Sequence, residues 1–146
     1  MENIRDKESV ISTEVALKEI NDFLYIYLFE DKTDEDLKED YPQLITAIEK
    51  GMLVFDSDDE MKPTFTLLNP VLTDDGSVDI DKIVFRTRMK ASDSERIFKG
   101  INVNQDMPKY LNILISYFAQ LKNRSYLDKI SKFDKKVIEQ VSTVFP

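Results

Sequence analysis

One stretch of this chain, Pro63–Met89, constrains its fold more than any other. Two apolar runs rich in β-forming residues flank the turn sequence Thr73-Asp74-Asp75-Gly76-Ser77. Asp-Gly between such runs is a strong hairpin signal, because glycine adopts the positive φ that a tight turn needs. A further short apolar run lies just upstream, at residues 52–55. The sequence therefore predicts a three-stranded antiparallel meander over residues 52–89, with strands at 52–55, 64–68 and 78–89.

Two irregularities are predicted within this meander. Pro70 has no N–H to donate, so we expect it at a strand end or on an edge strand. In the last strand the apolar positions change parity between Ile80 and Ile83. That change predicts a bulge or break at Asp81-Lys82.

The residues before the meander predict a helical N-terminal part over 12–51, preceded by a flexible segment at 1–11. A helix from about residue 14 to 29 would be capped by Ser12 or Thr13, although the run Phe23–Phe29 also fits a strand. Residues 30–40 fit either a solvated acidic loop or a helix start capped by Thr33 or Asp34. A further helix, capped by Asp40 and with Pro42 in its first turn, would end at Gly51.

The residues after the meander, 92–145, predict a second helical part. Ser92 and Glu95 have the spacing of a capping box, which predicts a helix over about 93–101. Asp106 would cap the next helix, in which nine of twelve positions from 110 to 121 are apolar. Such a helix is either central to the core or covered in part by a partner. A short helix at 126–130 and a last helix capped by Ser131 complete this part.

Length and pattern together indicate one domain over residues 1–146. The fold class is α+β: a small antiparallel β-hairpin or three-stranded meander packed with N-terminal and C-terminal helices.

Composition excludes several functional classes. The chain has no Cys and no His, so it offers no Cys or His zinc ligands and no Cys–His nucleophile. Its net charge of −8 argues against nucleic acid as a partner. No apolar run is long enough to cross a membrane, and the charged N-terminus lacks the apolar segment of a signal peptide. We therefore expect a cytoplasmic protein with no membrane contact.

The charge is unevenly distributed along the chain. Residues 1–108 hold 13 basic and 25 acidic side chains, whereas residues 109–146 hold seven basic and three acidic ones. This asymmetry fits either packing of two complementary halves or a dedicated charged docking surface.

The sequence offers no catalytic, cofactor-binding or metal-binding site. Its three glycines lie too far apart for a phosphate-binding loop. Asp56, Asp58 and Glu60 resemble the start of a calcium loop, but Met61 stands at the glycine position and Leu67 at the twelfth. Arg86 and Arg88 alternate on the last strand and fit either solvated or paired side chains, or an anion or partner contact. We expect no enzymatic activity and no cofactor.

Three short segments follow one another in a fixed order. The first is FTLLNPV at 65–71, followed by Asp75-Gly76; the second is IVFR at 83–86, leading to Ser92-Asp93; the third is YLNILI at 110–115, continuing to Val144-Phe145. Together they resemble the tail assembly chaperone family of contractile-tailed, Mu-like bacteriophages. The resemblance spans about 64–145 and leaves out the N-terminal third. The chain departs from the family at residues 122–125, where KNRS replaces the frequent Gly-Leu-Pro.

The resemblance implies a non-enzymatic protein of phage morphogenesis in the host cytoplasm. Such chaperones bind the tape measure protein, help to recruit tail tube subunits, and are absent from the finished particle. Alternatives are a structural tail or adaptor protein of a phage or prophage, and a generic cytoplasmic interaction module. The candidate partner-binding residues, each of which also fits the core, lie on the last two long helices: Tyr110, Leu114, Tyr117, Phe118, Leu121, Phe133, Val137, Val141 and Phe145.

Overall fold

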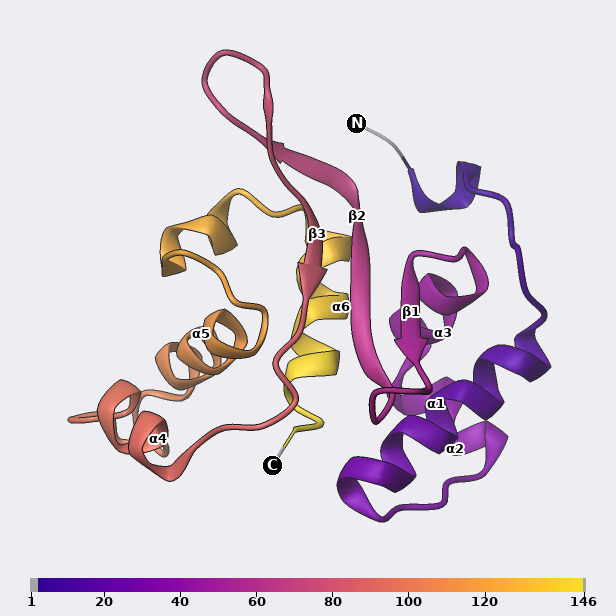
Figure 1. Ribbon diagram of the computed structural model, residues 1–146, viewed down its shortest axis with the longest axis horizontal. Coiled ribbons are helices and arrows are strands. Elements are labelled where there is room, and N and C mark those ends of the chain that lie inside the picture. The colour runs from indigo at the N-terminus through magenta and orange to yellow at the C-terminus, as the bar shows by residue number, and fades with distance from the viewer. Residues whose placement is uncertain (1–2, 146) are drawn as a thin grey trace.

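A three-stranded antiparallel sheet in the order β1-β2-β3 lies between two groups of helices (Figure 1). The computed structural model describes residues 3–145. Helices α1–α3 lie on the β1 side of the sheet, α4 and α5 lie on the β3 side, and α6 packs along β2 (Figure 1). The predicted α+β class is confirmed. The elements are η1 (Ile4–Asp6), α1 (Thr13–Leu28), α2 (Asp34–Asp40), α3 (Pro42–Glu49), β1 (Leu53–Asp56), β2 (Lys62–Leu72), β3 (Val78–Val84), α4 (Ala91–Ile97), α5 (Met107–Phe118), η2 (Arg124–Asp128) and α6 (Lys132–Ser142).

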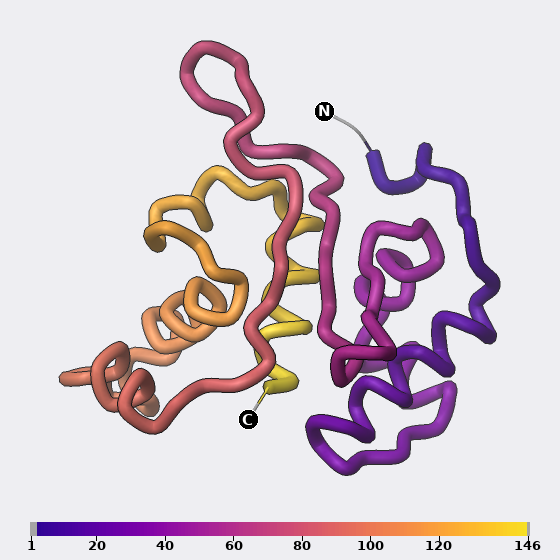
Figure 2. The backbone as a smooth tube through the Cα atoms, in the orientation of Figure 1, coloured from indigo at the N-terminus to yellow at the C-terminus, as the bar shows by residue number. Residues whose placement is uncertain are grey.

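The predicted meander forms, but its last strand is shorter than the sequence indicates. Phe65 of β2 pairs with Leu53 of β1 and with Ile83 of β3. β3 ends at Val84 rather than at residue 89, because the N–H of Arg86 donates to the carbonyl of Phe118 at 2.8 Å. The chain thus leaves the sheet to contact the end of α5. Figure 2 shows the turn of the β2–β3 hairpin projecting beyond the helices.

The pairing of β2 with β3 breaks near the predicted place. Thr66 pairs with Lys82, and the next pair is Val71 with Ile80, so residues 67–70 of β2 face Asp81 alone. The pairing shifts again between Val71 and Leu72, which leaves Asp79 of β3 without a pairing partner on β2. The predicted break at Asp81 is therefore present, and extra residues lie on both strands, most of them on β2. The prediction that Pro70 lies at a strand end or edge is wrong. It lies inside the central strand, within this break, where its missing N–H removes no ladder bond.

Helix α1 settles the ambiguous run at residues 23–29. The hydroxyl of Ser12 accepts the N–H of Val15 at 3.2 Å and caps the helix. The apolar side chains that α1 buries recur every three or four residues, so the run is helical and not a strand. They are Ala16, Leu17, Ile20, Phe23, Leu24 and Tyr27.

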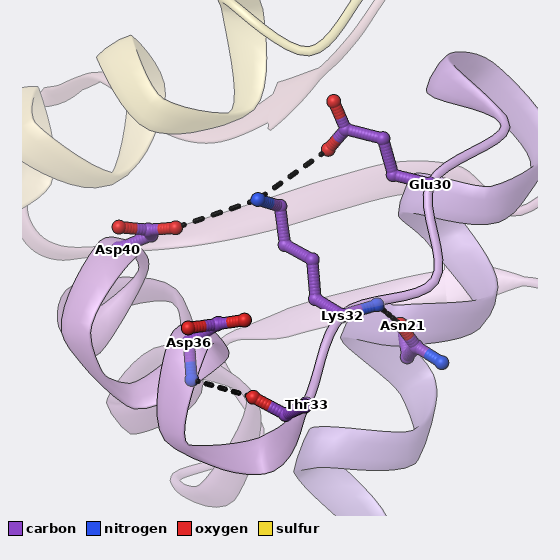
Figure 3. A network of polar contacts seen from close by, with 6 residues as sticks. All are labelled: Asn21, Glu30, Lys32, Thr33, Asp36 and Asp40. Carbon is purple, nitrogen blue, oxygen red and sulfur yellow. Dashed lines mark hydrogen bonds and ion pairs between the residues drawn. The ribbon is translucent and has the colours of Figure 1, made fainter.

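The acidic segment at 30–40 is a connection followed by helix α2. The hydroxyl of Thr33 accepts the N–H of Asp36 at 3.2 Å and caps α2. Lys32 anchors the connection: its N–H donates to Asn21, and its ammonium pairs with Glu30 at 3.6 Å and Asp40 at 3.5 Å (Figure 3). These carboxylates, Glu30 first, raise the pKa of Lys32. Helix α3 has Pro42 in its first turn, as predicted, but its N-cap is Tyr41 rather than Asp40.

The segment before α1, for which the sequence predicts flexibility, makes specific contacts within the described residues. The N–H groups of Val10 and Ile11 donate to the carbonyl of Glu49 at 2.7 and 3.3 Å, and the ammonium of Lys50 donates to the carbonyl of Lys7. Residues 1–2 of the predicted flexible segment lie outside the described residues. Residues 7–11 therefore pack against the end of α3.

Of the helix caps predicted after the meander, only one is present in the structure. Ser131 caps α6 as predicted. The capping box of Ser92 and Glu95 does not form, since α4 starts at Ala91 after Lys90, and Asp106 precedes α5 without a side-chain bond. The short helix predicted at 126–130 is a 3₁₀ turn at Arg124–Asp128.

An aromatic cluster joins the two ends of the chain in one core. The ring of Phe145 lies 5.1 Å from that of Tyr27, 5.8 Å from that of Phe23 and 5.0 Å from that of Phe118. Two of these contacts are edge-on, an arrangement that aromatic quadrupoles favour. Helices α1, α5 and α6 thus share one hydrophobic core with the sheet.

Candidate functional site

The structure divides the nine candidate partner-binding residues into two groups. Phe118, Val137, Val141 and Phe145 are buried in the core. They contact other parts of this chain, so in the folded protein they offer no surface to a partner. The remaining five are only partly buried and stay candidates: Tyr110, Leu114, Tyr117, Leu121 and Phe133.

Helix α5 carries most of the remaining candidates. Although it is apolar nearly all round, it fully buries only Ile115 and Phe118. Neighbouring α4 buries no side chain. The expectation that α5 is a central core helix is therefore wrong: α5 is an outer helix on the β3 side of the sheet (Figure 1). The α4–α5 face, defined by Phe98, Tyr110, Leu114, Tyr117 and Leu121, is partly exposed apolar surface.

Polar and aromatic contacts hold the α4–α5 face in place. The hydroxyl of Tyr117 donates to Asp93 of α4 at 2.8 Å, and the guanidinium of Arg86 lies 4.7 Å from the centre of the Tyr117 ring. The Tyr117 hydrogen bond lowers the pKa of Asp93, whereas desolvation raises the pKa of Tyr117. At the other end the rings of Phe98 and Tyr110 stack 4.7 Å apart. Arg86 is thereby assigned to a cation–π contact within the chain.

Arg88 likewise has a partner within the chain. Its guanidinium donates to both carboxylate oxygens of Glu60, at 3.1 and 2.9 Å. The backbone carbonyl of Glu60 accepts the hydroxyl of Tyr27 at 2.6 Å. Both arginines that the sequence analysis identified therefore have partners within the chain: Arg86 contacts Tyr117, and Arg88 pairs with Glu60.

Sequence reasoning missed an apolar patch at the end of α1. Tyr25, Ile26 and Phe29 are 60%, 41% and 82% exposed. The signal was present, because the run Phe23–Phe29 is apolar on every side of the helix and α1 can bury only one side.

Sequence reasoning also missed a groove of about 1330 Å³ between residues 3–5 and the start of α6. Four cations line it: Arg5, Lys132, Lys135 and Lys136. Phe133, which was predicted as a partner-binding residue, lies in its wall. The signal was the excess of basic residues after residue 108, but the sequence does not show that the N-terminal segment faces them.

Asp134 is the one fully buried acidic side chain among the described residues. Its carboxylate accepts the N–H groups of Leu68 and Asn69 and the hydroxyl of Ser131. Burial raises the pKa of Asp134, and the three hydrogen bonds oppose that rise. These hydrogen bonds join α6 to β2, so the carboxylate has a structural role in the fold.

The calcium-like segment after β1 is a turn. The N–H of Asp58 donates to the carboxylate of Asp56 at 3.1 Å. Across residues 3–145 no three His, Cys, Asp or Glu side chains gather as a metal ion would require. None of the helices within that range has the length and apolar character needed to cross a bilayer.

Comparison with known proteins adds no relative. No family model, no curated protein and no solved structure matches the chain.

Proposed function

We propose that this protein is a non-enzymatic phage tail assembly chaperone that binds helical segments of the tape measure protein through its α4–α5 face. The observation that carries the proposal is that, of the nine apolar residues among the twelve positions from 110 to 121, only Ile115, Phe118 and Ala119 are fully buried. A helix of this composition is stable on the surface when a partner covers it.

The spacing on α5 suits a helical partner. Tyr110, Leu114, Tyr117 and Leu121 follow one another at intervals of four, three and four residues, which places them on one side of the helix. A partner helix that lays its own apolar stripe along this side would cover the exposed part of each residue. The net charge of −8 favours a soluble complex.

The family resemblance supplies the identity of the partner. Its three segments begin on β2, β3 and α5, and the last of them includes every residue of the α4–α5 face except Phe98. On this proposal the protein acts in the host cytoplasm, holds the tape measure protein soluble, and helps tail tube subunits to reach it.

Co-expression tests the binding surface. The chain is produced together with apolar helical fragments of the tape measure protein encoded beside it, and the soluble fragment is quantified. We expect the wild-type chain to raise the soluble yield and the variant Tyr110→Ser/Leu114→Ser to lose that effect. The matched variant Val54→Ser/Val78→Ser, which changes exposed apolar residues on the sheet, keeps it. No gain with the wild-type chain would contradict the proposal.

A second measurement separates a chaperone from a structural tail or adaptor protein. Purified particles are analysed by quantitative mass spectrometry. A chaperone is absent or present only in traces, whereas a stoichiometric amount would assign the protein to the particle.

A further inference from the structure

We infer that the groove between residues 3–5 and the start of α6 is a second docking site, which takes an acidic peptide segment with an apolar side chain from a partner protein. This cationic groove is separate from the α4–α5 face, and the inference stands whatever that face binds. Its wall comes from η1, α3, β2 and α6, four elements that no continuous sequence motif connects.

The charge of the cationic groove is opposite to that of the protein. Arg5, Lys132, Lys135 and Lys136 line it, and Glu139 is the one acidic side chain in its wall. The carboxylate of Glu139 lies 3.9 Å from the ammonium of Lys136, and this is its one ion pair with the cations of the groove. Within residues 3–145 no carboxylate forms an ion pair with Arg5, Lys132 or Lys135. Among the described residues, three of the four cations that line the groove thus have no ion-pair partner, in a chain of net charge −8.

The acid closest in sequence to these lysines does not neutralise them by an ion pair. Both oxygens of Asp134 face the backbone of residues 68–69 and the hydroxyl of Ser131. The carboxylate is buried, whereas Lys132 and Lys136 are exposed. An external carboxylate is therefore the group that would complete the charge pairing in the cationic groove.

The shape and lining indicate a peptide. A volume of about 1330 Å³ exceeds the roughly 300–1,000 Å³ of small-molecule pockets. Ile4, Leu68 and Phe133 supply apolar wall. Such a wall fits an apolar side chain that lies between acidic residues of a peptide.

Two other occupants fit less well. A nucleic acid strand would have to bind a chain of net charge −8, which repels phosphate. A second copy would have to insert one of its acidic segments into the groove, a head-to-tail contact that does not close on itself. The test below includes both.

The experiment uses a fluorescent peptide that alternates glutamate pairs with single leucines, titrated into the full chain. We expect binding that weakens with salt and that falls about tenfold or more in Lys132→Glu/Lys135→Glu. Acidic residues near a helix N-terminus favour the helix, so this variant keeps the fold. Lys38→Glu/Lys99→Glu changes the net charge equally outside the cationic groove and keeps full affinity. Amide shifts in nuclear magnetic resonance spectra should concentrate at residues 3–5, 68–69 and 131–136.

Several results would overturn the inference. Equal affinity of the peptide for the wild type and both variants would show that the peptide does not bind in the cationic groove. A peptide with serines for leucines that binds as tightly would remove the apolar contact. Single-stranded DNA that competes at the same concentration would assign the cationic groove to nucleic acid. A dimer in sedimentation that Lys132→Glu/Lys135→Glu abolishes would assign it to a second copy.

Discussion

The buried carboxylate of Asp134 on α6 accepts the backbone N–H of Leu68 on β2, with 2.8 Å between oxygen and nitrogen. Its other oxygen accepts the N–H of Asn69 at 3.0 Å and the hydroxyl of Ser131 at 2.9 Å. The two N–H groups lie where β2 loses its pairing with β3. Asp134 therefore replaces the missing strand partner, and it caps the sheet irregularity and the helix start together.

Removing this carboxylate should destabilise the fold strongly. Asp134→Ala leaves two buried or half-buried backbone N–H groups without an acceptor, which costs about 2–4 kcal/mol of unfolding free energy. Ser131→Ala removes the helix cap and one of the three hydrogen bonds to the carboxylate but keeps the acceptor for both N–H groups of β2, and it costs about 1–2 kcal/mol. Urea unfolding of both variants measures the difference. Equal losses would mean that Asp134 acts only on the helix.

The hairpin turn should titrate at unusually low pH. The hydroxyl of Thr73, at 2.5 Å, and the N–H of Ser77, at 2.9 Å, hold the pKa of Asp75 down at about 2. A carboxyl whose folded pKa is depressed stabilises the fold above its unfolded pKa, and that stabilisation is lost as the pH falls through about 2.

Thr73→Val should therefore move the pKa of Asp75 toward the ordinary value of about 3.9. Ser77→Ala keeps the backbone donor and should move it less. Carboxyl carbon shifts in nuclear magnetic resonance spectra follow the titration. If Thr73→Val leaves the midpoint unchanged, the hydroxyl is not the main cause.

Two glycines with the same backbone conformation should respond differently to alanine. Gly51 and Gly100 have φ of +74° and +78°. A Cβ at Gly100 would meet nothing within 4 Å, whereas one at Gly51 would lie 2.8 Å from a methyl group of Val10. Gly100→Ala should cost about 1 kcal/mol for its backbone alone, and Gly51→Ala should cost more because it displaces the segment before α1.

Thermal unfolding compares the two substitutions, and hydrogen exchange at the amides of Val10 and Ile11 reports on the segment. Adding Val10→Ala to Gly51→Ala should remove the excess cost. Equal costs at the two glycines, with unchanged exchange, would contradict this account.

The end of α1 should gain stability from glycine. Phe29 follows α1 in the left-handed conformation with φ of 56°, and its side chain is 82% exposed. Phe29→Gly relieves the backbone and should raise the unfolding free energy by about 0.5–1 kcal/mol. Phe29→Ala keeps the Cβ and should bring no gain. Chemical unfolding measures the free energy of unfolding of both variants. A lower value for Phe29→Gly than for the wild type would show that the Phe29 ring makes stabilising contacts.

The sequence is most informative where one segment determines its own conformation. The hairpin at Asp75-Gly76 and the hydroxyl caps at Ser12, Thr33 and Ser131 all involve residues within three or four positions of each other. Their hydrogen bonds are local, so composition and spacing predict them.

Contacts between distant segments escaped prediction. Asp134 looks like a helix-start acid in the sequence, and nothing local shows that it bonds residues 68 and 69. The same holds for the cationic groove, which needs residues 3–5 beside α6. The partial exposure of α5 depends on which helix covers the sheet, and the local sequence does not show that. In the structure α6 packs along β2, and α5 packs against α6. Four of the nine candidate residues, Phe118, Val137, Val141 and Phe145, lie in the core, which is the other interpretation that their sequence pattern allows.

The aromatic cluster around Phe145 has a consequence for biosynthesis. Phe23 and Tyr27 leave the ribosome long before Phe145, yet their rings pack against it. Contacts that distant in sequence form late and slow the folding of a domain. Until Phe145 has been synthesised, the apolar side of α1 lacks one of the side chains that pack on it in the native structure. The native core therefore closes only once the segment that carries Phe145 has been translated, and until then the rings of Phe23 and Tyr27 lack one of their neighbours.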